Sequence, residues 1–144
     1  MNAQELLWRF AAGERDFAGV DLPGANLDGR RLSGSDLSRA NLRRARLAGA
    51  ELWGATLRRT RLDGATLRGA DLRRADLRGA SLRGADLSGA LVSGADLRGA
   101  DLYGANLSRV VFYGCDLTGA DLSAATLTGA KWYDPALARL RRGA

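Results

Sequence analysis

Carboxylate and guanidinium groups are the side chains of this 144-residue chain that could do chemistry. Two sets of charged residues are regularly spaced, at the interval from Asp76 to Asp96 or at twice that interval. They are Asp36, Asp76, Asp96 and Asp116, and Arg58, Arg78 and Arg98. Two carboxylates held at a suitable separation can cleave a glycosidic bond, and aligned guanidinium groups can bind an anion. A solvated ladder of ion pairs is the alternative, because neighbouring lines of opposite charge cancel.

Residues for other chemistry are scarce. The sequence has no histidine, which is the commonest metal ligand and a general base near neutral pH. Its single cysteine, Cys115, cannot form an internal disulfide or a cysteine metal cluster. A metal-binding spacing, a Ser/His/Asp set and a phosphate-binding glycine loop are also missing from the sequence. We therefore predict no catalytic residue, no metal, no cofactor and no small-molecule substrate.

A five-residue repeat must position the charged side chains. Every fifth residue from Phe17 to Trp132 is apolar, which makes a frame of 24 positions without insertion or deletion, and 20 of them are Leu. The residue two places before each is mostly Ala, and the residue two places after is mostly Gly. Between positions 19 and 129, six repeats have another residue in place of the glycine: Arg39, Arg44, Arg59, Arg74, Arg109 and Ala124.

This period fits neither a regular helix nor a strand. On an α-helix, steps of five residues turn the side chain by about 140° around the axis and make no stripe. On a strand, an odd period sends successive leucines to opposite faces. The leucines share one interior only if the chain bends after every pentapeptide, and Gly supplies the conformational freedom for the bend. Leu and Ala then point inward, which makes Cys115, at an Ala position, a buried substitute rather than a nucleophile.

Pentapeptides such as AELWG, ATLRR, ADLRG, ANLSR and ADLSG resemble the pentapeptide-repeat family over the stretch from Arg15 to Asp134. The resemblance implies an all-β solenoid, a right-handed quadrilateral parallel β-helix with four pentapeptides per coil. The 24 repeats then correspond to about six coils. We expect the structural core to include Phe17, Leu22, Leu42, Leu62, Leu82, Leu102, Phe112, Leu122 and Trp132.

The two ends of such a rod expose unpaired backbone unless they are capped. At the C-terminal end, Asp134 and Pro135 resemble an N-cap and a first helical residue, so we expect a short helical cap there. Within residues 2–12, apolar side chains at helical spacing predict an N-terminal capping α-helix: Leu6, Leu7, Phe10 and Ala11.

The chain is therefore predicted to have three parts. A capping helix occupies residues 1–14, the pentapeptide-repeat β-helix spans residues 15–134, and a C-terminal cap with a basic tail covers residues 135–144. No apolar run approaches the length of a membrane span, and the first residues lack the pattern of a secretory signal. We expect a cytoplasmic protein without a membrane partner.

One side of the predicted rod carries most of the large outward apolar side chains. An exposed cluster of this kind marks a contact with a second copy of the chain or with another protein. Stacking of neighbouring aromatic side chains on a β-surface is the alternative, and the concentration on one side favours an interface. The cluster consists of Trp53, Leu91, Val111, Tyr113 and Tyr133, with Tyr103 on an adjoining face.

The net charge of +6 is unevenly distributed. Residues 39–83 contain 12 arginines and four acidic residues, whereas residues 84–134 contain three basic and six acidic residues. An arginine belt of this kind could bind phosphate backbones. Its spread over all four faces favours a role in solubility instead.

We conclude from the sequence that the protein is a non-catalytic binding or scaffold protein with a rigid surface for protein–protein interaction. The alternative comes from the family resemblance, because some members imitate duplex DNA, bind DNA gyrase and confer quinolone resistance. The positive net charge disfavours this role, and only the acidic half could imitate phosphates. A weaker alternative is binding of an anion or nucleic acid through the arginine belt, with Arg58, Arg78 and Arg98 as the anion-binding ladder. The identity of the partner and the choice between monomer and dimer stay open.

Overall fold

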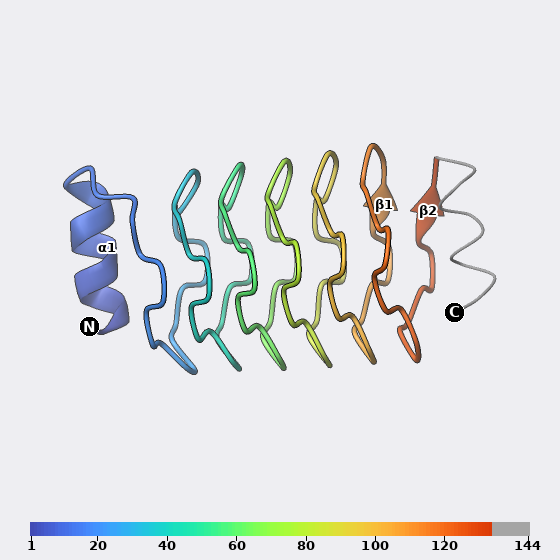
Figure 1. The fold of residues 1–144 in the computed structure, drawn as a ribbon, viewed down its shortest axis with the longest axis horizontal. Helices are drawn as coiled ribbons and strands as arrows, with labels where there is room; N and C mark the ends of the chain where they lie inside the picture. The colour runs from blue at the N-terminus through green and yellow to red at the C-terminus, as the bar shows by residue number, and fades with distance from the viewer. Residues whose placement is uncertain (134–144) are drawn as a thin grey trace.

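The computed structural model describes residues 1–133, which form a rod of stacked coils with a helix at its N-terminal end (Figure 1). Parallel backbone bridges join each bridging residue to the one four pentapeptides later, from Asp16↔Asp36 through Asn106↔Thr126. The strands β1 (Val111–Phe112) and β2 (Lys131–Trp132) pair in the same parallel register. Each coil therefore has four repeats, as the resemblance implied.

Each pentapeptide is one bridge followed by one turn. In the repeat centred on Leu22, the backbone N–H groups of Leu22 and Gly24 donate to carbonyl groups of the next coil, at 2.8 Å in both cases. The N–H of Ala25 then donates back to the carbonyl of Leu22 at 3.2 Å and closes the turn. Gly24 has φ 68°, the left-handed conformation that the third residue of a type II turn requires. Each pentapeptide therefore provides both the bend and the hydrogen bonds to the next coil.

The inside of the rod is a column of leucine with small residues beside it. Of the nine predicted core residues, eight are buried, from Phe17 through Leu122. Trp132 differs, because it is only half-buried, although its ring stacks on Phe112 with the centroids 4.3 Å apart. Trp132 therefore packs against the core cluster as a partly buried residue and is not one of its fully buried members.

The N-terminal helix α1 spans Ala3–Ala11, within the range predicted from the apolar spacing. Asn2 begins it, since its side-chain oxygen accepts from the backbone N–H of Glu5 at 2.9 Å. Leu6 is fully buried in the common core, and Leu7 and Phe10 are partly buried against it. Ala11, which the spacing placed on the inward face, is exposed.

The predicted C-terminal cap lies outside the described residues. Within residues 1–133, no helix is both long enough and apolar enough to cross a membrane.

Candidate interaction surfaces

The register of four pentapeptides assigns every outward side chain to a face of the rod. We call the face centred on the inward residues Leu32, Leu52, Leu72, Val92, Phe112 and Trp132 the aromatic face. The ladder face is centred on Phe17, Leu37, Leu57, Leu77, Leu97 and Leu117. The groove face is centred on Leu22, Leu42, Leu62, Leu82, Leu102 and Leu122.

The Asp or Asn before the central Leu accepts a hydrogen bond from the backbone N–H two residues further on. The sequence pattern did not lead us to predict this role. The side-chain oxygen of Asp36 accepts from the backbone N–H of Ser38 at 2.9 Å, and Asn106 accepts in the same way from Ser108 at 3.0 Å. Such side chains stabilise a turn two residues further on. The frequent Asp and Asn at this position were the available signal, and their first task is structural.

The ladder face is an array of ion pairs. Arg78 binds Asp76 through two hydrogen bonds of 2.9 and 2.7 Å, and Arg98 binds Asp96 with the same geometry. Links between coils are longer, at 3.5 Å from Arg78 to Asp96 and 3.7 Å from Arg98 to Asp116. Arg58 lies 3.8 Å from Asp76. The guanidinium groups of Arg78 and Arg98 are therefore occupied by carboxylates of the protein itself.

The carboxylates of the ladder are also unsuited to general acid catalysis. The hydrogen bonds from Arg78 lower the pKa of Asp76, and those from Arg98 lower the pKa of Asp96. A general acid needs a raised pKa so that it keeps a proton near neutral pH. Both groups are thus held as carboxylates, which favours the ion-pair interpretation over the catalytic one.

The large apolar side chains are exposed but do not form one continuous surface. In the register of the aromatic face, Arg73 and Ser93 lie between Trp53 and Tyr113. Arg73 binds Asp71 through two hydrogen bonds of 2.8 and 2.7 Å, so a charged pair interrupts the column. Trp53 is therefore isolated. The remaining four residues are close neighbours, and we call them the C-terminal apolar patch: Leu91, Val111, Tyr113 and Tyr133.

The C-terminal apolar patch consists of outward side chains in two parallel rows, which run across three successive coils. Leu91 and Val111 form a bridge on one line, and on the other the Tyr113 and Tyr133 rings meet edge to face with centroids 6.2 Å apart. The tyrosines are the most exposed members, at 65% and 61%. Stacking thus occurs, yet it leaves most of both rings in solvent.

Tyr103 follows Leu102 on the groove face, which lies two pentapeptides, or half a coil, from the aromatic face. The prediction that Tyr103 lies on a face adjoining the aromatic one was therefore wrong. The guanidinium of Arg83 sits over its ring, 4.6 Å from the centroid, and also donates to Asp101 at 2.9 Å. This arrangement ties Tyr103 to a charged neighbour, so it does not extend the C-terminal apolar patch.

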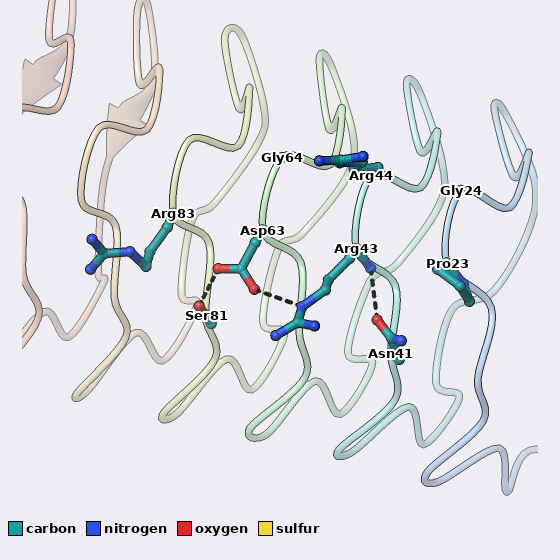
Figure 2. A pocket seen from close by; sticks show the side chains of 9 residues that line it. All are labelled: Pro23, Gly24, Asn41, Arg43, Arg44, Asp63, Gly64, Ser81 and Arg83. Carbon is teal, nitrogen blue, oxygen red and sulfur yellow. Dashed lines mark hydrogen bonds and ion pairs between the residues drawn. The ribbon is translucent and has the colours of Figure 1, made fainter.

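A shallow hollow lies further along the groove face, toward the N-terminal end (Figure 2). Asp63 stands at its centre, between Arg43 at 3.6 Å and the hydroxyl of Ser81, which donates to it. Arg83 points away from Asp63, and Arg44 lies along the upper rim beside Gly64. Since Asp63 is bound by Arg43 and Ser81 and the hollow is open to solvent, the described residues offer no buried acid or base there. Within residues 1–133, no group of three or more potential metal ligands occurs.

Cys115 is buried at an inward position. Its thiol donates to the carbonyl of Val92 at 2.9 Å, and burial raises the pKa of the thiol. A raised pKa keeps the sulfur protonated and weakens it as a nucleophile. The structural role predicted for Cys115 fits this environment.

Two outward features were not identified as surface sites from the sequence. Trp8 of α1 is 67% exposed, although it belongs to a helix that was analysed only for its inward face. The non-glycine residues at the corners all have φ between 55° and 60°: Arg39, Arg44, Arg59, Arg74, Arg109 and Ala124. Five arginines thus occupy a conformation that L-residues adopt at a cost. The sequence does mark these six positions, because each has another residue where the repeat usually has Gly.

The regular parallel bridges and the inward Leu and Ala columns define a solenoid of the β-helix class. The family model for pentapeptide repeats matches in eight copies over residues 16–49, 31–64, 57–94 and 93–129. The chain therefore belongs to the pentapeptide-repeat family.

The chain is also similar to several solved structures. The pentapeptide repeat protein Rfr23 from the cyanobacterium Cyanothece 51142 is 29% identical, with a TM-score of 0.54, over 89% of this chain and 93% of that chain. The protein alr5209 from Nostoc PCC 7120 is 36% identical, with a TM-score of 0.37, over 88% and 95%. QnrB1, a plasmid-mediated fluoroquinolone resistance protein, is 20% identical, with a TM-score of 0.37, over 92% and 89%. A search of the curated proteins finds no match.

Proposed function

We propose that the protein is a non-catalytic member of this family that presents a rigid surface to a protein partner or to a second copy of itself. The C-terminal apolar patch is the principal contact. Trp53 belongs to the same face as a separate, secondary contact, whereas Tyr103 lies on the opposite face and outside the contact.

The observation that supports this proposal is the exposure of the patch on an otherwise polar surface. Leu91 is 49% exposed and Val111 is 37% exposed, in addition to the two tyrosines. Tyrosine is enriched at interfaces because its ring buries a large apolar area while its hydroxyl keeps a hydrogen-bonding partner. The backbone beneath is paired from coil to coil, so the backbone needs little ordering when a partner binds.

In this proposal the rod is right-handed and four-sided, with about six coils, and α1 acts as its N-terminal cap. The burial of Leu6 in the common core supports the capping role. Removal of α1 would expose this apolar end and the backbone edge of the first coil.

The test is a double substitution, Tyr113→Ser with Tyr133→Ser, matched by Tyr103→Ser as a control. All three tyrosines are outward and exposed, so the variants should fold alike. Sedimentation analysis for self-association and a pull-down with the protein as bait measure binding. We expect the double variant to lose the dimer or the captured partner and the control to retain it. Equal behaviour of both variants and the parent would show that the patch only stacks on itself.

Binding of DNA gyrase is the alternative, and the acidic outward residues of the C-terminal half are the feature that favours it. The ladder face argues against it, because guanidinium groups neutralise Asp76 and Asp96. A gyrase supercoiling assay with and without a quinolone separates the two functions. Inhibition of supercoiling, or protection of the enzyme from the drug, would favour the alternative.

A further inference from the structure

Two arginines occupy one corner of the rod in successive coils. Arg39 and Arg59 lie one coil apart, at the turn between the ladder face and the groove face, with φ 58° and 55°. The same corner continues with Gly79, Gly99 and Gly119. We call the stacked pair, together with its neighbours Arg58 and Arg61, the arginine corner.

A single arginine at a corner is explained by the aliphatic part of its side chain, the stem, which packs on the glycine of the next coil. A Cβ placed on Gly79 would lie 3.4 Å from Cγ of Arg59, so the stem of Arg59 covers the next coil. Arg74 covers Gly94 in the same way, and Arg109 covers Gly129, at 3.4 and 3.3 Å. The corner of Arg74 and the corner of Arg109 each hold only one arginine.

Stem packing does not explain two arginines in succession. Adjacent coils are about 4.8 Å apart, so two arginines at one corner in successive coils repel each other unless an anion lies near them. Both residues also carry the cost of left-handed backbone, which glycine at the same corner avoids. Two effects therefore disfavour this pair of arginines: the left-handed backbone and the repulsion between like charges.

Carboxylates of the protein do not relieve this charge. Among the described residues, none lies within ion-pair distance of the guanidinium groups of Arg39, Arg59 or Arg61. Arg58 reaches only Asp76, at 3.8 Å, and Asp76 is already bound by Arg78 at 2.7 Å.

A small open hollow of ≈ 330 Å³ lies between these side chains, lined by Ser38, Arg39, Arg58 and Arg59. The nearby carboxylate of Asp36 accepts from the backbone N–H of Ser38. The hollow thus has three guanidinium groups around it and an exposed position on a convex edge.

We propose that the arginine corner binds the phosphodiester backbone of a nucleic acid, with one phosphate group between Arg39, Arg58 and Arg59. The planar guanidinium fork matches two phosphate oxygens, and a bound phosphate removes the repulsion within the pair. A convex edge contacts an extended polyanion but cannot enclose a small molecule. This site shares only Arg58 with the predicted ladder, because Arg78 and Arg98 are occupied by Asp76 and Asp96.

Paired glycine substitutions test the site. Arg39→Gly with Arg59→Gly removes two charges from the corner, and Arg74→Gly with Arg109→Gly removes two charges from other corners with the same backbone conformation. Fluorescence anisotropy with a labelled single-stranded DNA oligonucleotide measures affinity between about 50 and 200 mM salt. We expect the first pair to bind about tenfold more weakly, with the slope of log K against log salt shallower by about 1.4. The second pair should bind like the parent.

Glycine suits all four positions, so thermal melting of both pairs should show folding at least as stable as in the parent. Arg39→Gln with Arg59→Gln keeps the stems and removes only the charge, and it should lose the same affinity. Equal loss in the two glycine pairs would mean that net charge alone attracts DNA. No measurable binding by the parent, or equally strong competition by polyglutamate, would also overturn the proposal.

Discussion

The two halves of the rod share one core and differ at their corners. Arginine fills four of the nine corner positions in residues 39–83 but one of the ten in residues 84–133. The parallel register of four pentapeptides nevertheless continues through both halves. The frame thus accepts strained, charged corners without a change of pairing, which leaves the surface free to vary while the interior stays constant.

The outward apolar side chains have the opposite distribution. The C-terminal apolar patch lies entirely within residues 91–133, whereas Trp53 in the other half stands alone. One half therefore has guanidinium groups without a carboxylate partner among residues 1–133, and the other has an apolar surface. The two halves therefore present surfaces of different chemistry on one continuous frame.

The largest effect should come from the core, where the two halves are expected to be equivalent. Leu62 and Leu102 are both fully buried under the groove face. We expect Leu62→Ala and Leu102→Ala each to lower the free energy of unfolding by about 2–5 kcal/mol, measured by chemical denaturation. A clearly larger loss in one half would show that the frame is not uniform.

Buried polar groups at the Ala position should have a smaller effect. The Thr60 hydroxyl donates to the carbonyl of Leu37 at 2.7 Å, and the Cys115 thiol makes the matching bond in the other half. We expect Thr60→Val to cost about 0.5–1.5 kcal/mol in denaturation experiments, because it loses a hydrogen bond at constant shape. Cys115→Ala should cost less, since a thiol is a weak donor. The reverse order would contradict a role for these bonds in stability.

An exchange of corner residues sharpens the contrast between the halves. Arg59 and Gly99 occupy the same corner, with φ 55° and 67°. Arg59→Gly should raise the free energy of unfolding by about 0.5 kcal/mol, because the relief of left-handed strain exceeds the added chain entropy of Gly. Gly99→Arg should lower it by a similar amount. Thermal melting of both variants checks the sign, and a stabilising Gly99→Arg would exclude strain as the explanation.

The smallest effect should come from the exposed ion pairs of the ladder face. The pKa values of Asp76 and Asp96 are lowered by their arginine partners from the ordinary 3.8. A lowered pKa stabilises the fold above the unfolded value, and this contribution disappears as the pH falls through the folded value. Asp76→Asn with Asp96→Asn should melt slightly below the parent at pH 7. The difference should vanish in acid and shrink at high salt, and a difference independent of pH would point to lost packing instead.

Much of the fold was predictable from the five-residue spacing. The frame predicts an interior of Leu and Ala, a bend at each Gly and outward positions for the aromatic residues, and the structure confirms each of these. The helical spacing near the N-terminus likewise predicts α1 with Leu6 inside. These features depend on neighbours along the chain, which the sequence displays directly.

The arrangement of the candidate sites was less predictable. Spacing alone does not say how many pentapeptides close a coil, and the number four came from the resemblance to the family. The ladder arginines were grouped as an anion site, yet Arg78 and Arg98 have carboxylate partners while Arg59 has none among the described residues. Whether a guanidinium is paired depends on side-chain directions within a few ångströms, which residue types do not specify.

The order of residues within each pentapeptide determines what lies inside, where the chain bends and which side chains face solvent, because these choices are made over five neighbouring residues. Pairing between coils decides which outward side chains meet. Residues such as Tyr113 and Tyr133, or Arg39 and Arg59, become neighbours only when backbone bridges bring positions one coil apart into register. Both candidate contact surfaces arise from that long-range pairing.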